Sequence, residues 1–338
     1  MTKQINPDEI IFFGKKNKYR DFLIRYLMEK NPIFKKVKVY KKENLQPDME
    51  CKYILCTWDV PVLSEEEVAY YFPNLRAIFY SGGTVKYFAM PYFKRNVRIF
   101  SGAEANSIPV AEFVLAQIIL ANKGFFKSMR RGFFYPLRKS NYQATQKYIF
   151  TIGGNYDKVV GIIGVGNVGR HLIKLLKGFN LKIQVYDPFM SDEEAKYLEV
   201  SKVTLETLFT TSHVITNHLP DLPETKNIIN SGLLKLMMFN AVIINTGRGN
   251  QINEQDLISF LKQRKDVTAL LDLTKKIPLP FLSPLHRLRN VYLTPHIAGS
   301  SYSETDRLNE YIHTSFTDYI KGVEPRGEVF ESDLKIKA

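Results

Sequence analysis

One segment limits the fold of this chain more than any other. An apolar run, VVGIIGVGNVG at residues 159–169, is followed by a helical stretch and then by LKIQVYDPF. The run contains Gly164-x-Gly166-x-x-Gly169, and Asp187 ends the second apolar run 18 residues after Gly169. Strand, glycine turn, helix and acid-terminated strand together form the context that a dinucleotide-binding fingerprint requires. The sequence therefore predicts a Rossmann-type unit.

Each residue of this fingerprint has a physical role in the prediction. Gly164 allows a tight turn, Gly166 lets backbone N–H groups approach a pyrophosphate, and Gly169 lets the helix pack close to the strand. The positive amino end of that helix then faces the phosphates. Asp187 is expected to accept hydrogen bonds from the adenosine ribose and to repel a 2′-phosphate, which favours NAD over NADP. A glycine-rich turn that binds nothing is the weaker alternative.

The rest of the chain alternates apolar runs with amphipathic stretches, both before residue 104 and after residue 157. Such alternation predicts parallel sheets covered by helices, and thus an α/β fold. Between the two series lies an apolar helix, expected to start with Asn106 as its cap and to be buried between domains or subunits. The last 38 residues are too few to form a domain and are expected to dock on one.

Polar groups come directly after four later apolar runs. Because the carboxyl ends of parallel strands bind ligands in open α/β sheets, these positions predict a site. The groups are His218 and Pro220, Thr246 to Gly249, Asp272, and His296.

The net charge of +13 raises the question of a nucleic-acid partner. The strongest candidate is the segment 123–148, which has seven Lys or Arg, no acid and interleaved aromatics. It matches no nucleic-acid motif, so we expect a connecting arm whose aromatics pack on the body or on a second subunit. Nucleic acid is therefore an unlikely partner, whereas a small anionic substrate would be attracted.

Several other classes are disfavoured. We find no signal peptide, and no segment is expected to reach the roughly 18 apolar residues of a membrane span. Cys51 and Cys56, the only cysteines, lie in what we interpret as one strand, too far apart for a disulfide. We therefore expect a cytoplasmic protein without a metal site.

The chain resembles the D-isomer-specific 2-hydroxyacid dehydrogenases. The matching pieces occur in that family's order: Asn-x-x-Pro-Val-Ala-Glu from Asn106, GIIGVGNVGR, VYDPF, NHLPDLPETKNII, INTGRG, LLDLT, PLPFLSPL and NVYLTPHIAGS. The first hundred residues match mainly in pattern and in SGGTV. The resemblance implies an NAD-binding Rossmann domain, residues 105–299, inserted into a flavodoxin-like substrate domain, residues 1–104 plus 300–338. It also implies a homodimer.

The resemblance further implies hydride transfer between NAD(H) and a small 2-hydroxy or 2-keto acid. Arg248 matches the arginine that grips the substrate carboxylate, and His296 matches the general acid. Gly83 and Thr84 match the loop that contacts substrate, with Thr84 also near the cofactor. The remaining matches to cofactor contacts are Asn167, Val168, Leu219, Thr246, Gly247 and Asp272, in addition to the fingerprint residues.

One position departs from the family pattern. The family has a Glu five residues after the acid that matches Asp272, immediately before a Pro, and this chain has Ile277 there. Without that carboxylate, His296 is expected to favour its neutral form and to be less well oriented, which weakens proton donation. Asp272 and Glu304 are candidate substitutes. The alternative is an NAD-bound, non-catalytic scaffold or sensor of the co-repressor type.

Overall fold

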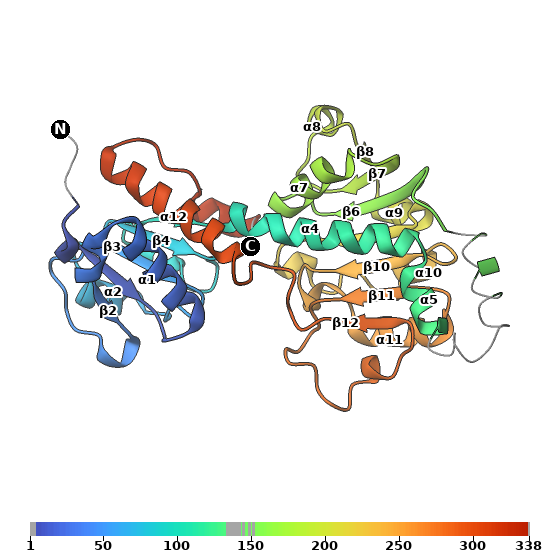
Figure 1. Ribbon diagram of the computed structural model, residues 1–338, viewed down its shortest axis with the longest axis horizontal. Helices are drawn as coiled ribbons and strands as arrows, with labels where there is room; N and C mark the ends of the chain where they lie inside the picture. The colour runs from blue at the N-terminus through green and yellow to red at the C-terminus, as the bar shows by residue number, and fades with distance from the viewer. Residues whose placement is uncertain (1–4, 133–142, 144–145, 148–149, 151–152, 337–338) are drawn as a thin grey trace. The chain divides into compact units, whose positions relative to one another are not determined.

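The computed structural model describes residues 5–132, 143, 146–147, 150 and 153–336. The chain divides into two compact units, residues 1–107 with 300–338 and residues 108–299. Each unit has its own sheet (Figure 1), and apolar side chains are buried on both faces of each sheet. This arrangement confirms the predicted α/β class.

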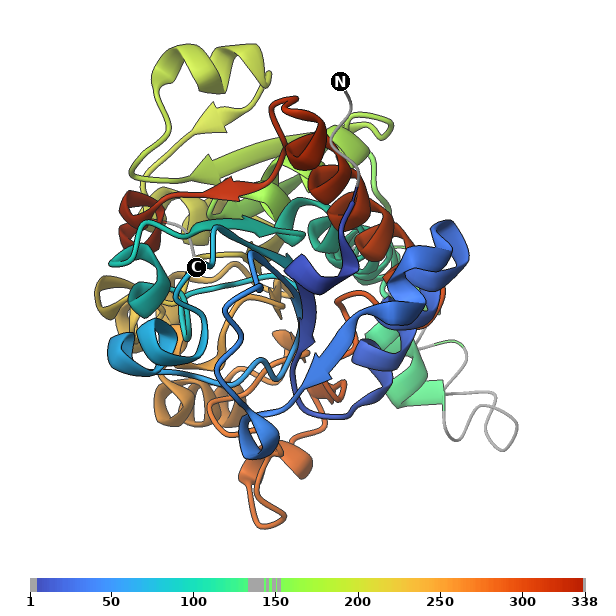
Figure 2. The same cartoon turned by 90° about the vertical axis from the view of Figure 1, so that its left-hand side faces the viewer.

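The sheet of the first unit has the strand order β13-β5-β4-β3-β1-β2. All its neighbouring strands are parallel except β13, which runs antiparallel to β5; Figure 2 shows the red β13 beside the teal β5. The strands are β1 (Ile10–Phe13), β2 (Lys38–Tyr40), β3 (Tyr53–Thr57), β4 (Ala77–Ser81), β5 (Arg98–Ser101) and β13 (Glu328–Val329). Cys51 and Cys56 are both buried free thiols, but only Cys56 lies within β3, and Cys51 precedes the strand, so the interpretation that both lie in one strand is wrong.

Local signals in the sequence set the ends of the helices in this unit. The side chain of Asn17 caps α1, Ser64 and Glu67 form a capping box at α2, and Gly322, with φ +74°, ends α12. The helices are α1 (Lys18–Lys30), α2 (Glu65–Tyr71), α3 (Met90–Phe93) and α12 (Glu304–Lys321). Short 3₁₀ turns lie at Pro7–Glu9, Pro32–Lys36, Lys42–Asn44 and Glu331–Lys335.

The end of the chain completes the first unit. Phe316 of α12 packs on Phe79 of β4 and Tyr53 of β3, with ring centroids 5.2 and 5.8 Å apart. Arg98 of β5 donates through Nε and Nη2 to the carboxylate of Glu328, both at 2.6 Å. Helix α12 and strand β13 therefore dock on the sheet that strands β1 to β5 build, as expected for this end of the chain.

The second unit carries an all-parallel sheet of seven strands, in the order β12-β11-β10-β9-β6-β7-β8. Chain order reverses between β6 and β9, which is the switch point where doubly wound sheets bind dinucleotides. This topology confirms the predicted Rossmann-type unit. The strands are β6 (Lys158–Ile163), β7 (Leu181–Tyr186), β8 (Ser201–Lys202), β9 (Val214–Asn217), β10 (Val242–Asn245), β11 (Thr268–Leu271) and β12 (Val291–Leu293).

Five helices and three 3₁₀ turns connect the described strands of this sheet. The helices are α7 (Asn167–Leu176), α8 (Asp192–Tyr197), α9 (Leu205–Thr211), α10 (Ser231–Leu236) and α11 (Glu254–Gln263). The 3₁₀ turns are Pro223–Thr225, Gly249–Gln251 and Pro284–His286.

Helix α4 (Ala103–Asn122) differs from the expectation in two ways. It begins three residues before Asn106, so Asn106 is not its cap; the Asn106 side chain instead accepts a hydrogen bond from Ser300 N at 3.1 Å. By length and composition alone, α4 is also apolar enough to cross a membrane, with a mean hydropathy of 1.3. The expectation that no segment reaches that length is therefore wrong. Val114 and Ile118 of α4 are buried in the core of the second unit, as in the core helix of a soluble domain.

The basic segment 123–148 begins as helix α5 (Phe125–Gly132), and most of its remainder lies outside the described residues. The Phe126 ring packs on Tyr292 of β12, with centroids 5.1 Å apart, and the Tyr292 hydroxyl donates to Phe126 O. Lys127 Nζ donates to Asn240 Oδ1 at 2.7 Å. The start of this segment therefore packs on the second unit.

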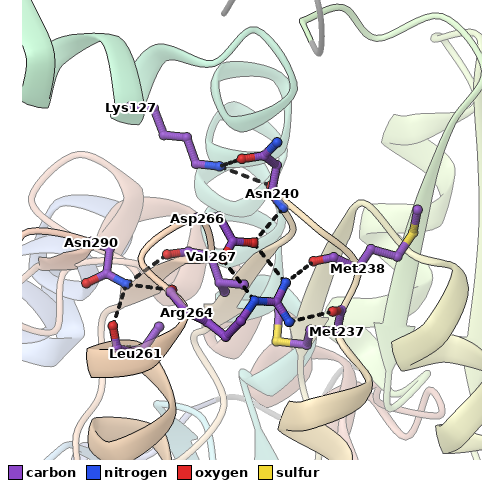
Figure 3. Close-up of polar contacts among 9 residues, drawn as sticks. All are labelled: Lys127, Met237, Met238, Asn240, Leu261, Arg264, Asp266, Val267 and Asn290. Carbon is purple, nitrogen blue, oxygen red and sulfur yellow. Dashed lines mark hydrogen bonds and ion pairs between the residues drawn. The ribbon is translucent and has the colours of Figure 1, made fainter.

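A group of hydrogen bonds around Arg264 and Asp266, called the clasp below, connects the turns at the amino ends of the strands of this sheet (Figure 3). After α11, Arg264 donates through Nε and Nη2 to both carboxylate oxygens of Asp266, at 2.9 and 2.8 Å, and also to the carbonyls of Met237 and Met238. Asp266 in turn accepts from Asn240 N at 3.0 Å. Burial alone would raise the pKa of Asp266, but these hydrogen bonds and the guanidinium charge lower it to about 2.

Candidate functional site

The predicted site residues of the second unit gather at one edge of its sheet. His218, Thr246 and Asp272 follow directly after β9, β10 and β11, and His296 follows β12 after two intervening residues. These four strands are neighbours and parallel, and β6, which ends at the glycine turn, lies next to β9. Long-range strand pairing therefore brings the fingerprint and the polar strand ends to the same edge.

The glycine turn after β6 has the geometry of a phosphate cradle. Gly164 has φ +88°, and a Cβ there would lie 2.9 Å from the backbone of His218. A Cβ on Gly169 would lie 2.4 Å from Gly164 O, so only glycine lets α7 approach the turn this closely. Gly166 has nothing within 4 Å of its Cβ position and lies at the amino end of α7, next to Asn167 and Val168. The turn is open where a diphosphate would enter.

Asp187 supports this turn as well as ending β7. Its Oδ2 accepts a hydrogen bond from Val165 N at 2.7 Å, and its Oδ1 accepts from Phe189 N at 2.8 Å. The carboxylate is therefore held beside the glycine turn in a defined orientation, with lone pairs left for ribose hydroxyls.

His218 is a partly buried, neutral group at the centre of this edge. Its Nε2 lies 2.9 Å from Thr216 Oγ1 and its Nδ1 lies 3.3 Å from Thr246 Oγ1. Burial lowers the pKa of His218 to about 3, so the imidazole is uncharged at neutral pH. The sequence placed His218 at a strand end but did not distinguish it as a partly buried, hydroxyl-bonded group.

Arg248 is half-buried at the turn after β10. Its Nη1 donates to Gly247 O at 2.8 Å, and its backbone N donates to Gln251 Oε1 at 2.8 Å. Burial lowers the pKa of the guanidinium, and the carboxylate of Asp221 opposes part of that shift. A guanidinium remains charged in proteins, so Arg248 presents a cation at this edge.

Asp272 fixes the loop that carries His296. Its Oδ1 accepts from Thr294 Oγ1 at 2.6 Å and from Ile297 N at 2.9 Å, and its Oδ2 accepts from Ala298 N at 3.0 Å. His296 has φ +56°, which is uncommon for a residue with a side chain. Asp272 holds the Thr294 side chain before His296 and the backbone N–H groups of Ile297 and Ala298 after it, which accounts for this conformation.

No hydrogen bond to the His296 ring is found among the described contacts. Ile277, at the position of the family Glu, is 59% exposed. Asp272 is used by the backbone, and Glu304 Oε2 accepts from Ser301 N at 2.9 Å at the start of α12. Within the described set, Asp272 makes no hydrogen bond to the imidazole, and the substitute role of Glu304, which belongs to the first unit, stays a prediction.

The two predicted loop residues of the first unit follow β4. Gly83 O accepts from Ser101 Oγ at 2.6 Å, and Thr84 Oγ1 accepts from Lys86 N at 3.3 Å. Ser81, the first residue of this SGGTV segment, donates through Oγ to Asn309 Oδ1 of α12 at 2.6 Å. Helix α12 and β5 therefore hold this loop in place.

Comparison with known proteins decides the family. Residues 127–298, just over half of the chain, match the model of the "D-isomer specific 2-hydroxyacid dehydrogenase, NAD binding domain" family. The chain belongs to this family. The resemblance expected from the sequence motifs is therefore confirmed, and so is NAD as the cofactor of this domain.

Proteins similar to this chain include enzymes with different substrates. The chain is 29% identical to a D-3-phosphoglycerate dehydrogenase of Synechocystis sp. over 70% of its own length and 41% of the relative's. It is 26% identical to a glyoxylate reductase of Korarchaeum cryptofilum over 72% of each. The apo D-mandelate dehydrogenase of Rhodotorula graminis has the same fold, with a TM-score of 0.75, 18% identity and coverage of 95% and 97%. The chain thus spans about two fifths of the first of these relatives.

The residues of the second unit fit the cofactor that the family implies. The open backbone at Gly166, the amino end of α7 and the carboxylate of Asp187 offer groups for a diphosphate and a ribose. Leu219 and Thr246 are both buried beside the turn, and His218 adds a neutral surface. No group of three or more metal-ligating side chains occurs among the residues that the structure describes.

A further set of residues at this edge was missed from the sequence. Asn217, Asn245 and Gln251 form a hydrogen-bonded cluster of buried amides between β9 and β10. Asn217 and Asn245 lie within the NHLPDLPETKNII and INTGRG segments, but their spacing does not show that they meet, and Asn217 and Gln251 are 34 residues apart in the chain. The only sequence signal is an amide at the end of each of two otherwise apolar strands.

Proposed function

We propose that the chain is an NAD-dependent D-2-hydroxyacid dehydrogenase that interconverts a small 2-keto acid and its 2-hydroxy acid. The observation that carries the proposal is the arrangement of Arg248 and His296. They follow β10 and β12, which only β11 separates, at the sheet edge where the glycine turn lies. A fixed cation and an imidazole beside a nicotinamide site are what reduction of a 2-keto acid requires.

The roles of the residues follow from their chemistry. NAD(H) supplies or accepts the hydride when bound. Arg248 binds the substrate carboxylate with its fork and polarises the carbonyl. His296 gives a proton to the carbonyl oxygen during reduction and takes it back during oxidation. Asp272 orients the His296 loop through three hydrogen bonds. Because His218 is neutral, the positive charge that attracts an anionic substrate comes from Arg248.

We assign the substrate-domain role to the first unit and the flavodoxin-like architecture to its sheet. The strand order β2-β1-β3-β4-β5 supports this assignment, because it is the order of flavodoxin-like sheets. In this proposal, Gly83 and Thr84 both contact the substrate, and Thr84 also contacts the cofactor. Asp187 supports a preference for NAD over NADP, which the ratio of kcat/KM for the two reduced cofactors tests.

The direct test is oxidation of NADH with a panel of 2-keto acids, such as glyoxylate, pyruvate, hydroxypyruvate and phenylpyruvate. We expect turnover with at least one of them, and loss of about 100-fold or more in kcat/KM in Arg248→Leu and His296→Asn. Both variants should still bind NADH. Turnover that survives both substitutions would contradict the assigned roles.

A second candidate is an NAD-bound scaffold or sensor without catalysis. It is favoured by one observation: the exposed Ile277 stands where the family has a Glu, and Asp272, the candidate carboxylate of the second unit, bonds to the loop and not to the His296 ring within the described residues. Tight NADH binding without turnover of any keto acid in the panel would select this candidate. Turnover would exclude it as the sole function.

We further propose a cytoplasmic homodimer that does not bind nucleic acid. The family membership and the packing of Phe126 and Lys127 on the second unit support a structural role for the start of the basic segment. Light scattering after size-exclusion chromatography tests the dimer. A gel shift at low salt tests nucleic-acid binding, for which we expect none.

A further inference from the structure

Three amide side chains are completely enclosed between the ends of β9 and β10. Asn217, Asn245 and Gln251 are 0%, 1% and 0% exposed. Asn217 Nδ2 donates to Asn245 Oδ1 at 2.9 Å and to Gln251 Oε1 at 2.5 Å. Buried amides destabilise a fold unless their polar atoms find partners, so the partners of this amide cluster indicate what it holds in place.

Gln251 connects two turns with one side chain. Its Nε2 donates to Leu219 O at 2.6 Å and to Pro220 O at 2.9 Å, both in the turn after β9. Its Oε1 accepts from Arg248 N at 2.8 Å, in the turn after β10, in addition to Asn217. Both N–H groups and both lone pairs of the Gln251 amide are therefore used.

Asn245 holds the other side of the same turn. Its Nδ2 donates to Arg248 O and to Leu273 O, both at 3.3 Å, and its Oδ1 accepts from Gly247 N at 3.3 Å. Gly247 O is the acceptor of the Arg248 guanidinium at 2.8 Å. The amide cluster therefore fixes the backbone N–H and C=O of Arg248, and also the peptide that holds its side chain.

We propose that Gln251, supported by Asn217 and Asn245, is a positioning residue that sets Arg248 at a fixed distance from the Leu219–Pro220 turn. This inference rests on the proposed function, because it assigns Arg248 to the substrate carboxylate and Leu219 to the cofactor. A satisfied amide cluster with no spare N–H group favours a single arrangement. A two-point contact between a guanidinium and a carboxylate is lost if the fork moves by about 1 Å.

Gln251→Met tests the proposal, because it keeps the length of the side chain and removes its four hydrogen bonds. The probe is oxamate, an analogue of a 2-keto acid, added to the protein–NADH complex and followed by NADH fluorescence. We expect the Kd of oxamate and the KM of the keto acid to rise by about tenfold or more, with a smaller fall in kcat. An unchanged Kd would overturn the proposal.

Asn290→Leu is the matched control. Asn290 is a 3% exposed amide whose Nδ2 donates to the carbonyls of Leu261, Arg264 and Val267 at the opposite edge of the same sheet (Figure 3). Both substitutions remove buried hydrogen bonds, so both should lower Tm. Only Gln251→Met should weaken oxamate binding, and equal weakening in Asn290→Leu would show a general loss of stability and overturn the proposal.

A measurement without substrate separates this proposal from the proposed function. Amide hydrogen exchange of residues 246–250 should be faster in Gln251→Met than in the wild type or in Asn290→Leu. Failure of wild-type protein to bind oxamate or turn over keto acids would contradict the proposed function, whereas the exchange data would still decide whether Gln251 holds the turn. Unchanged exchange would overturn the positioning role.

Discussion

At the scale of single residues, the backbone around His296 is better defined than the contacts of its ring. Asp272 accepts three hydrogen bonds from Thr294, Ile297 and Ala298, which places the loop, whereas no described hydrogen bond orients the imidazole. Asp272 therefore fixes the position of the loop but not the orientation of the His296 ring. The family Glu, which would orient the ring, is replaced by Ile277 in this chain.

Ile277→Glu should increase reductase activity. A carboxylate there would favour the protonated imidazole and orient it, so we expect about a tenfold or greater rise in kcat and a shift of the high-pH limb of the pH–rate profile to higher pH. Because Ile277 is 59% exposed, the substitution should leave Tm almost unchanged. Steady-state kinetics from pH 5 to 9 provide the measurement.

Ile277→Gln is the control for this change, since it has nearly the same shape without the charge. It should leave the pH limb in place. If the Glu variant has a rate no higher than the wild type, the missing carboxylate is irrelevant or replaced by another group.

At the scale of structural elements, the β6–α7 turn separates cofactor binding from stability. Gly166 has φ −75° and open space at its Cβ position, so Ala is compatible with the fold there. Gly169 faces Gly164 O at 2.4 Å from its Cβ position, so Ala forces the helix away from the strand. The two glycines of one motif are therefore required for different physical reasons.

Gly166→Ala should keep the wild-type Tm and raise the Kd of NADH by about tenfold or more, because its methyl group occupies the approach of the diphosphate. Gly169→Ala should lower stability by about 1–3 kcal/mol and also weaken NADH binding. Thermal denaturation and NADH fluorescence titration check both variants. A large fall in Tm for Gly166→Ala would contradict this division of roles.

The clasp after α11 makes a second prediction for an element (Figure 3). Asp266→Asn removes the charge that Arg264 contacts at 2.8 Å and should lower the free energy of unfolding by about 1–3 kcal/mol. The clasp lies at the amino-terminal edge of the sheet, so the Kd of NADH should not change. Urea denaturation together with NADH titration tests both statements, and weaker NADH binding would show coupling between the two edges.

At the scale of the whole molecule, three histidines link stability to pH. Burial is the largest cause that lowers the pKa of His213 and His218 in the second unit and of His313 in the first. In the unfolded chain each titrates near its ordinary value of about 6.5. Below that pH the unfolded state binds more protons than the folded state, so stability falls as the pH decreases.

For His218 this window runs from about 6.5 down to about 3. We expect the free energy of unfolding of the second unit to fall by about 1–3 kcal/mol more between pH 7.5 and 4.5 in the wild type than in His218→Asn. Urea denaturation at the two pH values measures this difference. His286→Asn, at an exposed position, is the control and should keep the wild-type pH dependence.

The sequence predicted most of the second unit, because its signals are local. The spacing of Gly164, Gly166, Gly169 and Asp187, together with the apolar runs and the helical stretch around them, identified the cofactor turn. The start of α4 was predicted four residues late, at Ser107 instead of Ala103, because Asn106 has the properties of a cap but bonds to Ser300 instead. A capping residue does not show from the sequence which of its potential partners it will meet.

The amino-acid sequence by itself determined the α/β class, the Rossmann-type unit, the family and the order in which Arg248, Asp272 and His296 follow their strands. These properties depend on periodicity and on short spacings that the chain carries wherever it folds. Only the tertiary structure decided that Gln251 meets Asn217, that Asp272 holds the His296 loop, and that His218 is partly buried and neutral. Each of these depends on contacts between strands far apart in the chain, and such pairings have no local signature.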